Sequence, residues 1–277
     1  MRLGIDIGGT NIVFGLVDDA GHMVRTATSK SFDKTASLED TLRALKDRIQ
    51  PFLSENVTHI GIGVPSALDQ ETGVVYNAIN IPSWQNVPLK QILEEAFGVP
   101  VCLNNDSNCY ALGAYRHFQE EQPKSLVGVT LGTGVGLGLV IDGQLFSGNN
   151  TGAGEVGCIR YLDADLETYC SSQFFARHNT TAKDVAEAVE KGDRTAQELF
   201  DQFGHHMGHL VATILYAYDP EMLVLGGGIA RGYKYFKDGM ERCLQEVFIY
   251  PTSLKRLKIR HLTNDEIALM GAAFLQK

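Results

Sequence analysis

The sequence predicts an α/β fold of two lobes with a central cleft, in which one structural unit occurs twice, and two observations carry this prediction. Residues 3–17 consist of an apolar run, a turn that contains Gly8 and Gly9, and a second apolar run, which is the pattern of a β-hairpin. Residues 126–141 repeat this order around Gly132, and both copies then enter an Asp/Gly turn. Because self-similarity along a chain indicates a repeated structural unit, we expect one such hairpin in each lobe.

The composition is typical of a globular protein whose partners are small molecules. The chain has 277 residues, 44% of them hydrophobic, and a net charge of −9, which argues against general affinity for nucleic acid or an anionic membrane. The first strand follows Met1 and Arg2 directly, so we expect no signal peptide, no membrane span and a cytoplasmic protein. Five cysteines without a Cys-x-x-Cys pair favour reduced thiols.

The turn of each hairpin is suited to phosphate, because glycines leave backbone N–H groups uncovered. Asp6 can hold Mg²⁺ through water, and Thr10 offers a hydroxyl to a phosphate oxygen. One such turn is more often an ordinary hairpin, but two copies about a domain apart are typical of a two-lobed kinase or ATPase with its nucleotide in the cleft. The candidate ATP-binding residues are Asp6, Gly8, Gly9, Thr10 and Asn11 in the first copy and Gly132, Thr133 and Gly134 in the second.

The segment between the hairpins predicts alternating strands and helices. We expect a strand over 23–31, a helix from Ser37 to Ile49 and a buried strand over 59–64 that opens into a loop. Such loops bind ligands in α/β proteins, which makes Ser66 a candidate. Asn80 and Trp84 follow on an irregular segment before a helix over 88–97. This tryptophan either faces a sugar beside the amides or anchors the segment.

A polar cluster, Asn104–Asn108, separates a short buried strand over 100–103 from a helix predicted over 109–118. Asp106 or Ser107 could simply cap this helix. Three amides and a carboxylate exceed what a cap needs, and a carboxylate near a helix N-terminus keeps its charge easily. The cluster therefore predicts a ligand-binding role.

The second half of the chain adds further candidates. Glu155 lies in a flexible, glycine-rich loop over 148–158, where a carboxylate can press against a small ligand. His205 and His209 lie four residues apart on a helix predicted over 194–218, but no cysteine or carboxylate stands beside them in the sequence, so a metal site is disfavoured. After a strand over 222–225, Gly226, Gly227 and Gly228 form either a surface for adenine or ribose or a plain turn.

The order of these motifs along the whole chain resembles the ROK family of bacterial sugar kinases and repressors. This resemblance implies the duplicated actin-like, ribonuclease H-like fold shared by actin, hexokinase and the 70-kDa chaperones, with a small N-terminal lobe (1–117 plus 265–277) and a larger C-terminal lobe (118–264). It implies Asp106 as catalytic base, the hairpins at the phosphates and the triple glycine near adenosine. It places Asn105, Asp106, Glu155 and Glu167 at the sugar. Ser66 and Asn80, in the loops described above, are the other two candidates for sugar binding.

The chain departs from this family at a zinc site. The family usually has Glu-x-Gly-His where this chain has Glu155 to Cys158, and its Cys-x-Cys-Gly-x-x-Gly-Cys loop is missing. A closed structural zinc site needs about four ligands. We therefore expect no structural zinc and a shortened loop held by packing of Ile159, Tyr161 and Leu162.

The resulting hypothesis is an ATP- and Mg²⁺-dependent kinase, expected to be a homodimer, that phosphorylates a glucose-type hexose at O6 with Asp106 as general base. The alternative is an N-acetylhexosamine kinase acting on N-acetylmannosamine or N-acetylglucosamine. A sugar-sensing regulator is disfavoured because the acidic chain, starting at the phosphate hairpin, offers no place for a helix-turn-helix. Two further alternatives are a sugar sensor without catalytic activity and an ATPase that binds no sugar. Both are disfavoured because the chain has Asp106 beside Asn105.

Overall fold

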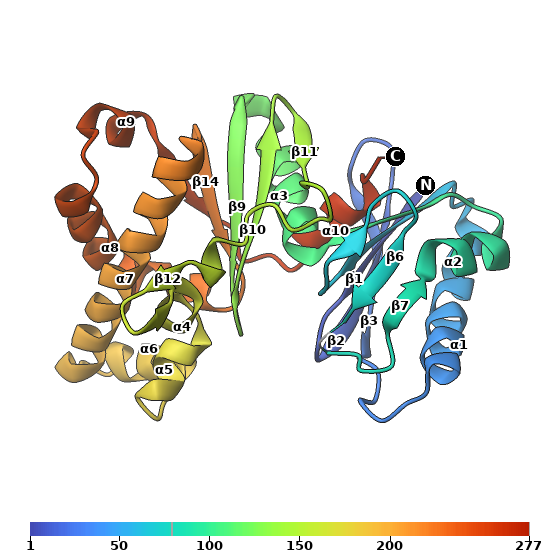
Figure 1. Ribbon diagram of the computed structural model, residues 1–277, viewed down its shortest axis with the longest axis horizontal. Coiled ribbons are helices and arrows are strands. Elements are labelled where there is room, and N and C mark those ends of the chain that lie inside the picture. Colours follow the sequence, from blue (N-terminus) through green and yellow to red (C-terminus); the bar gives the residue numbers. More distant parts are fainter. Residues whose placement is uncertain (79, 277) are drawn as a thin grey trace.

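The computed structural model describes residues 1–78 and 80–276 and has two lobes, each built on one five-stranded sheet (Figure 1). The strand order is β3-β2-β1-β4-β8 in the first sheet and β11-β10-β9-β14-β15 in the second. In both sheets an antiparallel three-stranded meander continues into two parallel strands. The same topology occurs twice, so the predicted duplicated α/β fold is confirmed.

The first sheet is formed near the N-terminus by strands that match the predicted ones. The hairpin of β1 and β2 keeps a regular register from Arg2↔Val17 to Ile7↔Ile12, so residues 8–11 connect the last paired positions. Apolar residues on β1, β2 and β4 form the core of this lobe. The strand bounds are β1 Arg2–Ile7, β2 Asn11–Val17, β3 Met23–Lys30, β4 His59–Val64 and β8 Val101–Asn105.

The second sheet repeats the hairpin with β9 and β10, whose register runs from Ser125↔Ile141 to Leu131↔Val135. Its turn consists of residues 132–134. The parallel partner β14 lies beside β9 and ends at Gly226, so the triple glycine begins where this strand stops. The strand bounds are β9 Ser125–Leu131, β10 Val135–Ile141, β11 Gln144–Phe146, β14 Met222–Gly226 and β15 Lys258–His261.

Two helices cross between the sheets, α3 (Asp106–His117) and α10 (Glu266–Ala273) (Figure 1). α3 packs on the second sheet, because a Cβ on Gly128 of β9 would lie 2.8 Å from the Cα atom of Ala111. α10 packs on the first sheet, where a Cβ on Gly61 of β4 would clash with the Ala272 carbonyl. Each helix therefore packs on the sheet opposite to the strand that precedes it, which is β8 for α3 and β15 for α10.

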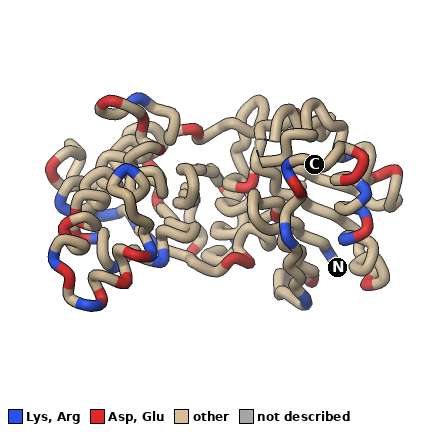
Figure 2. Tube along the Cα trace, turned by 90° about the horizontal axis from the view of Figure 1, so that it is seen from below, with Lys and Arg blue, Asp and Glu red and all other residues tan. Residues whose placement is uncertain are grey.

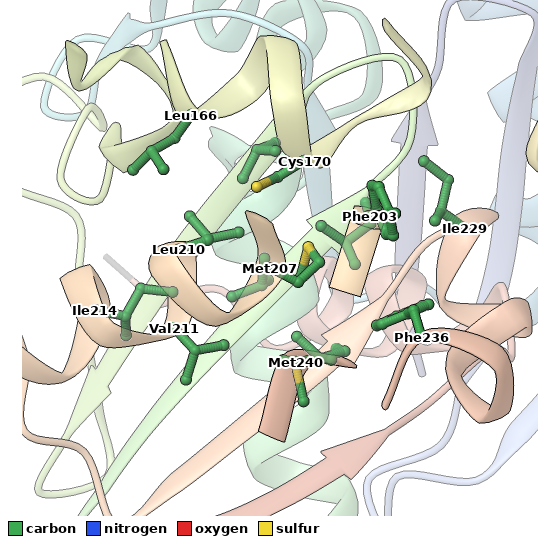
Figure 3. Packing of buried hydrophobic residues seen from close by; sticks show 14 of the residues in the cluster. Leu166, Cys170, Phe203, Met207, Leu210, Val211, Ile214, Ile229, Phe236 and Met240 are labelled. Atoms are coloured by element: carbon green, nitrogen blue, oxygen red, sulfur yellow. The ribbon is translucent and has the colours of Figure 1, made fainter. Parts of the chain in front are cut away.

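The remaining helices cover the outer faces of the two sheets (Figure 1). The core of the second lobe is filled by aromatic and aliphatic side chains of α7 and α8, such as Phe203, Met207 and Phe236 (Figure 3). The helix bounds are α1 Leu38–Ile49 and α2 Leu89–Phe97 in the first lobe, and α4 Leu166–Cys170, α5 Ser172–Arg177, α6 Ala182–Glu190, α7 Arg194–Tyr218, α8 Tyr233–Val247 and α9 Pro251–Arg256 in the second.

The surroundings of Trp84 decide between the two roles that the sequence left open. Trp84 precedes β7 and is fully buried, with its indole N–H donating to the Thr41 hydroxyl at 2.9 Å. It anchors the segment, and the alternative that it faces a sugar is wrong. The short strands are β5 Leu68–Asp69, β6 Val74–Asn77, β7 Gln85–Pro88, β12 Arg160–Tyr161 and β13 Ala164–Asp165; the 3₁₀ turns are η1 Gln50–Glu55, η2 Gln119–Glu121, η3 Val156–Cys158 and η4 Ile229–Gly232.

Charged residues of both signs are scattered over both lobes (Figure 2). This distribution agrees with the expectation that phosphate is held locally rather than by a broad basic surface. Within the described residues, no helix combines the length and the apolar composition that a membrane span requires.

Candidate functional site

Two adjoining cavities open in the cleft between the sheets. The carboxylate cavity, of about 680 Å³, is lined by all six residues proposed to contact sugar: Ser66, Asn80, Asn105, Asp106, Glu155 and Glu167. The glycine cavity, of about 660 Å³, is lined by Asp6, Gly8, Gly9, Thr10, Asn11, Gly132, Gly227 and Gly228. Asp106, Thr130 and four glycines of the turns line both cavities. A ligand in one cavity can therefore meet a ligand in the other at Asp106.

The first hairpin turn lies at the boundary between the two cavities. Its backbone is closed by the Gly8 N–H, which donates to the Asn11 carbonyl at 2.9 Å, while Ser31 donates its hydroxyl to the Gly8 carbonyl at 2.8 Å. A Cβ on Gly9 would lie 3.0 Å from the side-chain amide of Asn80. Glycine is therefore needed at residue 9 for the turn to approach the opposite wall.

Asp106 begins α3, three residues earlier than predicted, and it is not the cap. Asn105 is the N-cap, since its side-chain oxygen accepts from the Ser107 N–H at 2.9 Å. Oδ1 of Asp106 also accepts from this N–H at 2.9 Å. Because the helix is already capped by Asn105, the carboxylate of Asp106 is not required for capping and its position in the cavity wall has another cause.

Burial, with a smaller contribution from the nearby carboxylate of Glu155 and against the hydrogen bonds from Ser107, raises the pKa of Asp106 to about 6. An acid with this pKa is ionised at neutral pH and can still accept a proton readily. This is the property that a general base requires.

The prediction that the whole polar cluster binds ligand is wrong for Asn104 and Asn108. Both are buried: Asn104 donates to the Ser147 hydroxyl at 3.0 Å, and Asn108 donates to Asn104 Oδ1 at 2.9 Å and to the Thr151 carbonyl at 3.1 Å. The Thr151 hydroxyl in turn accepts from the Leu68 N–H at 3.2 Å. This network fixes the loop that leads to Glu155, so these amides position a ligand-binding residue rather than bind ligand.

The two glutamates occupy different surroundings. Glu167, at the start of α4, accepts from the Val135 N–H at 2.9 Å through one oxygen and from the Gln173 amide at 3.2 Å through the other. It therefore joins the second hairpin to the carboxylate cavity. Glu155 is exposed, and the Cys158 thiol lies 3.9 Å from its Oε2. Sequence reasoning missed Gln173, which lines the cavity and belongs to no recognisable motif.

Ser66, Thr133 and Gly134 also line the carboxylate cavity. The Ser66 hydroxyl lies 2.8 Å from the carbonyls of Ala67 and Asn77, so it braces its own loop as well as facing the cavity. Thr133 and Gly134 do not line the glycine cavity, whereas Gly132 lines both. The second turn thus lies at the boundary between the cavities, and Gly132 is its one residue that lines both.

The three glycines at the end of β14, residues 226–228, have separate roles. A Cβ on Gly226 would clash with the ring of Tyr110, so this glycine allows α3 to pack on the strand and does not line the glycine cavity. Gly227 has φ +83°, and a Cβ there would clash with the Leu131 carbonyl. Gly228 faces open space in the cavity wall. Only Gly227 and Gly228 are therefore placed to lie against a nucleotide.

The residues around Asp6 fit a divalent cation. Burial, together with repulsion from Asp106 and Asp265, raises the pKa of Asp6 to about 7. Carboxylates that repel one another in a cavity lined by backbone N–H groups favour Mg²⁺ together with phosphate. Asp265 was missed by sequence reasoning because it comes from the start of α10, far along the chain from the first hairpin.

The shortened loop is held differently from the prediction. Ile159 and Leu162 are 46% and 63% exposed, so they do not hold the loop. Tyr161 does: its hydroxyl lies 3.1 Å from Nδ1 of His206, and its ring packs edge-on against Tyr169. In the part of the chain that the structure describes, Cys158, Cys170 and His178 do not gather into a group of three metal-ligand atoms.

Comparison with known proteins gives consistent matches over the whole chain. A family model described as ROK family matches residues 2–277. A glucokinase from Halalkalibacterium halodurans is 31% identical over 266 residues, covering 83% of this chain and 80% of the relative. An N-acetyl-D-glucosamine kinase from Vibrio cholerae is 30% identical over an alignment of 305 positions, covering 99% of each.

Among solved structures, a ROK family glucokinase from Streptomyces griseus in complex with glucose and AMPPNP is similar, with a TM-score of 0.81 and 26% identity. The likeness covers 98% of this chain and 97% of that one. The similarity therefore includes both lobes and the cleft between them.

Proposed function

The chain belongs to the ROK family, and from this premise we propose that it is a sugar kinase that transfers the γ-phosphoryl group of ATP to the 6-hydroxyl of a hexose. Its fold is the actin-like ATPase fold of the ROK kinases to which it is similar. One observation carries the proposal: among the described residues, Asp106 is the one carboxylate that lines both cavities. A sugar hydroxyl in one cavity and a phosphate in the other would meet beside it.

In this proposal Asp106 accepts the proton of the attacking hydroxyl. Its pKa of about 6 leaves it mostly ionised at neutral pH. General-base assistance of this kind contributes about 10²–10⁴-fold to a rate. Asn105 and Glu155, which line the same cavity, would hold neighbouring hydroxyls and so orient the attacking one.

The turns of the two hairpins would hold the phosphates through backbone N–H groups, with Gly227 and Gly228 against the adenosine. Asp6 would hold Mg²⁺ through water, and Asp265 adds negative charge to the same wall. A bound divalent cation neutralises charge on the transferring phosphoryl group. Closure of the lobes on both substrates would exclude water as a competing acceptor.

A glucose-type hexose is the proposed substrate, and an N-acetylhexosamine is the alternative that the Vibrio cholerae relative favours. Specificity for either depends on the cavity wall around one or two hydroxyls. Cys158 does not line the carboxylate cavity, but its thiol lies 3.9 Å from Oε2 of Glu155, so it could act on specificity only through that side chain. Because a thiol is a weak hydrogen-bond donor, it would hold Glu155 less firmly than a strong donor would.

A sugar panel tests the proposed function. ADP release with MgATP is measured for glucose, mannose, fructose, allose, N-acetylglucosamine, N-acetylmannosamine and 6-deoxyglucose. We expect turnover with at least one hexose or N-acetylhexosamine and none with 6-deoxyglucose, which lacks the accepting hydroxyl. ADP release that no sugar increases would contradict the kinase proposal, and turnover of 6-deoxyglucose would contradict transfer to O6.

The contacts of the two glutamates predict different defects. Glu155→Ala should weaken sugar binding by about 2- to 100-fold and leave ATP binding unchanged, because a lost hydrogen bond costs about 0.5–3 kcal/mol. Glu167→Ala should weaken the binding of both, because it also removes the acceptor of the Val135 N–H at the second hairpin. Calorimetric titration with sugar and with a non-hydrolysable ATP analogue measures both affinities.

Glu198→Ala, which removes an exposed carboxylate from α7, is the matched control and should change neither affinity. Equal weakening of nucleotide and sugar binding in Glu155→Ala would place Glu155 outside the sugar site.

We further propose the lobe boundaries 1–117 with 265–277 and 118–264, a cytoplasmic location and a homodimer. The strands of the first sheet lie within 2–105 and those of the second within 125–261, which supports the boundaries. Cytoplasmic location follows from use of ATP, an intracellular metabolite. The exposed side chains of Tyr216, Ile249 and Tyr250 at the end of α7 and beyond α8 form an apolar patch that a dimer would cover, and sedimentation velocity measures this association.

A further inference from the structure

Three metal-ligand side chains meet between α7 and α8, away from both cavities. They are His205 and His209 on α7 and Cys243 on α8, and their ligand atoms all lie within 4.8 Å of one another. The sequence argument against a metal at the two histidines was that no cysteine stands beside them. The fold supplies that cysteine from the neighbouring helix.

Close packing of the two helices brings Cys243 to this position. A Cβ on Gly208 would lie 2.6 Å from the Cβ atom and 2.8 Å from the Sγ atom of Cys243, so α8 approaches α7 at a point where α7 has no side chain. Residues four apart on a helix lie on one face, which places both imidazoles beside the same point. The two rings lie edge to face, with centroids 5.1 Å apart, rather than stacked.

We propose that His205, His209 and Cys243 form a binding site for Zn²⁺ that joins α7 to α8. Zn²⁺ prefers imidazole and thiolate ligands in tetrahedral geometry with bonds of about 2.0–2.3 Å, which sets ligand atoms about 3.3–3.7 Å apart. Separations of up to 4.8 Å would close to this value through small rotations of His205, which is exposed, and of His209, which is partly exposed. Water would be the fourth ligand on that exposed side.

The burial of the ligands suits a site that joins two helices, since Cys243 is buried, His209 is half-buried and His205 is exposed. Zn²⁺ binds neutral imidazole and thiolate, so the thiol must give up its proton to the solvent when the metal binds. Metal binding should therefore release a proton and weaken as the pH falls.

The site lies behind the loop that carries the two glutamates. The ring of Tyr161, on β12 between Glu155 and Glu167, packs 5.2 Å from the ring of His209, measured between centroids. A metal that fixes His209 also fixes the surface against which Tyr161 packs. The site is distinct from the usual zinc position of the family, which would include residue 158.

Cobalt substitution tests the proposal on the whole protein. After chelator treatment, one equivalent of Co²⁺ should give thiolate-to-cobalt charge-transfer absorption and the visible bands of tetrahedral cobalt, and Zn²⁺ should remove both. His205→Gln changes an exposed side chain, so the protein should fold, and it should bind Co²⁺ at least tenfold more weakly. Cys243→Ser should abolish the charge-transfer band.

Two control variants locate the metal. His117→Gln removes an exposed histidine from the end of α3, and Cys158→Ser removes an exposed thiol beside Glu155; neither should alter the spectrum. Loss of the charge-transfer band in Cys158→Ser would overturn the proposal. So would a parent spectrum without thiolate coordination, or a spectrum that His205→Gln leaves unchanged.

Discussion

Asp106→Asn is expected to lower kcat by about a hundredfold or more while sugar and ATP still bind. The amide has the size of the carboxylate and can keep the contact with the Ser107 N–H, but it cannot accept the proton of the attacking hydroxyl. Since Asn105 caps α3, the helix should remain intact. Steady-state turnover and calorimetric titration with the sugar found in the panel measure the two effects.

The same variant should be more stable than the parent above pH 6. The pKa of Asp106 is raised in the folded state from 3.8 to about 6, so the folded protein holds a proton that the unfolded chain releases. This contribution to stability is fully present below about pH 4 and is lost as the pH rises through 6. The amide of Asp106→Asn does not titrate, so the variant does not lose this stability at high pH. Its melting temperature should therefore exceed that of the parent at pH 8 and approach it near pH 4.

Asp238→Asn, at an exposed position on α8, is the matched control and should change neither turnover nor this pH dependence. Turnover of Asp106→Asn within a few-fold of the parent would show that another group accepts the proton.

The elements around the site could be predicted because their signals are local. The hairpin of β1 and β2 needs only apolar runs on both sides of a Gly-Gly turn, and its register connects residues close in sequence. The second hairpin carries the same information, and the repetition indicated two lobes. Asp106 could be found because it directly follows a buried strand.

The roles of individual polar residues could not be predicted, because they depend on partners far along the chain. Asn104 and Asn108 looked like ligand-binding amides, but both are buried, and their N–H groups donate to Ser147, Thr151 and, for Asn108, also Asn104. For Trp84 the sequence left a sugar contact and a structural anchor open, and Thr41 on α1 decides for the anchor because it accepts from the indole N–H. A sequence shows which groups need a hydrogen bond, whereas the fold decides which group supplies it.

The glycines illustrate the same limit. The sequence placed Gly132 and Gly134 at the phosphates and the 226–228 run near adenosine. In the structure Gly226 instead serves packing, since it makes room for Tyr110 of α3, as Gly128 of β9 does for Ala111. Glycine permits close approach by a ligand and by a helix alike, so its presence in a sequence does not distinguish the two.

Asp6→Asn is expected to lower kcat/KM for MgATP by about a hundredfold or more and to leave sugar binding unchanged. Asp6 ends β1 beside the phosphate turn and lines the glycine cavity but not the carboxylate cavity. Cation-assisted stabilisation of a transferring phosphoryl group is worth several kcal/mol, and a neutral amide holds hydrated Mg²⁺ poorly. Turnover at increasing Mg²⁺ and fixed ATP measures the loss.

The parent enzyme should show a pH signature that Asp6→Asn lacks. Because the pKa of Asp6 is about 7 without a cation, Mg²⁺ must displace a proton from a part of the molecules at neutral pH. The Mg²⁺ concentration needed for half-maximal turnover should therefore fall as the pH rises through 7 in the parent, and this dependence should be absent from the variant. Asp19→Asn, at the exposed end of the same hairpin, is the matched control and should behave as the parent does. An unchanged Mg²⁺ requirement in Asp6→Asn would assign the cation to Asp265 instead.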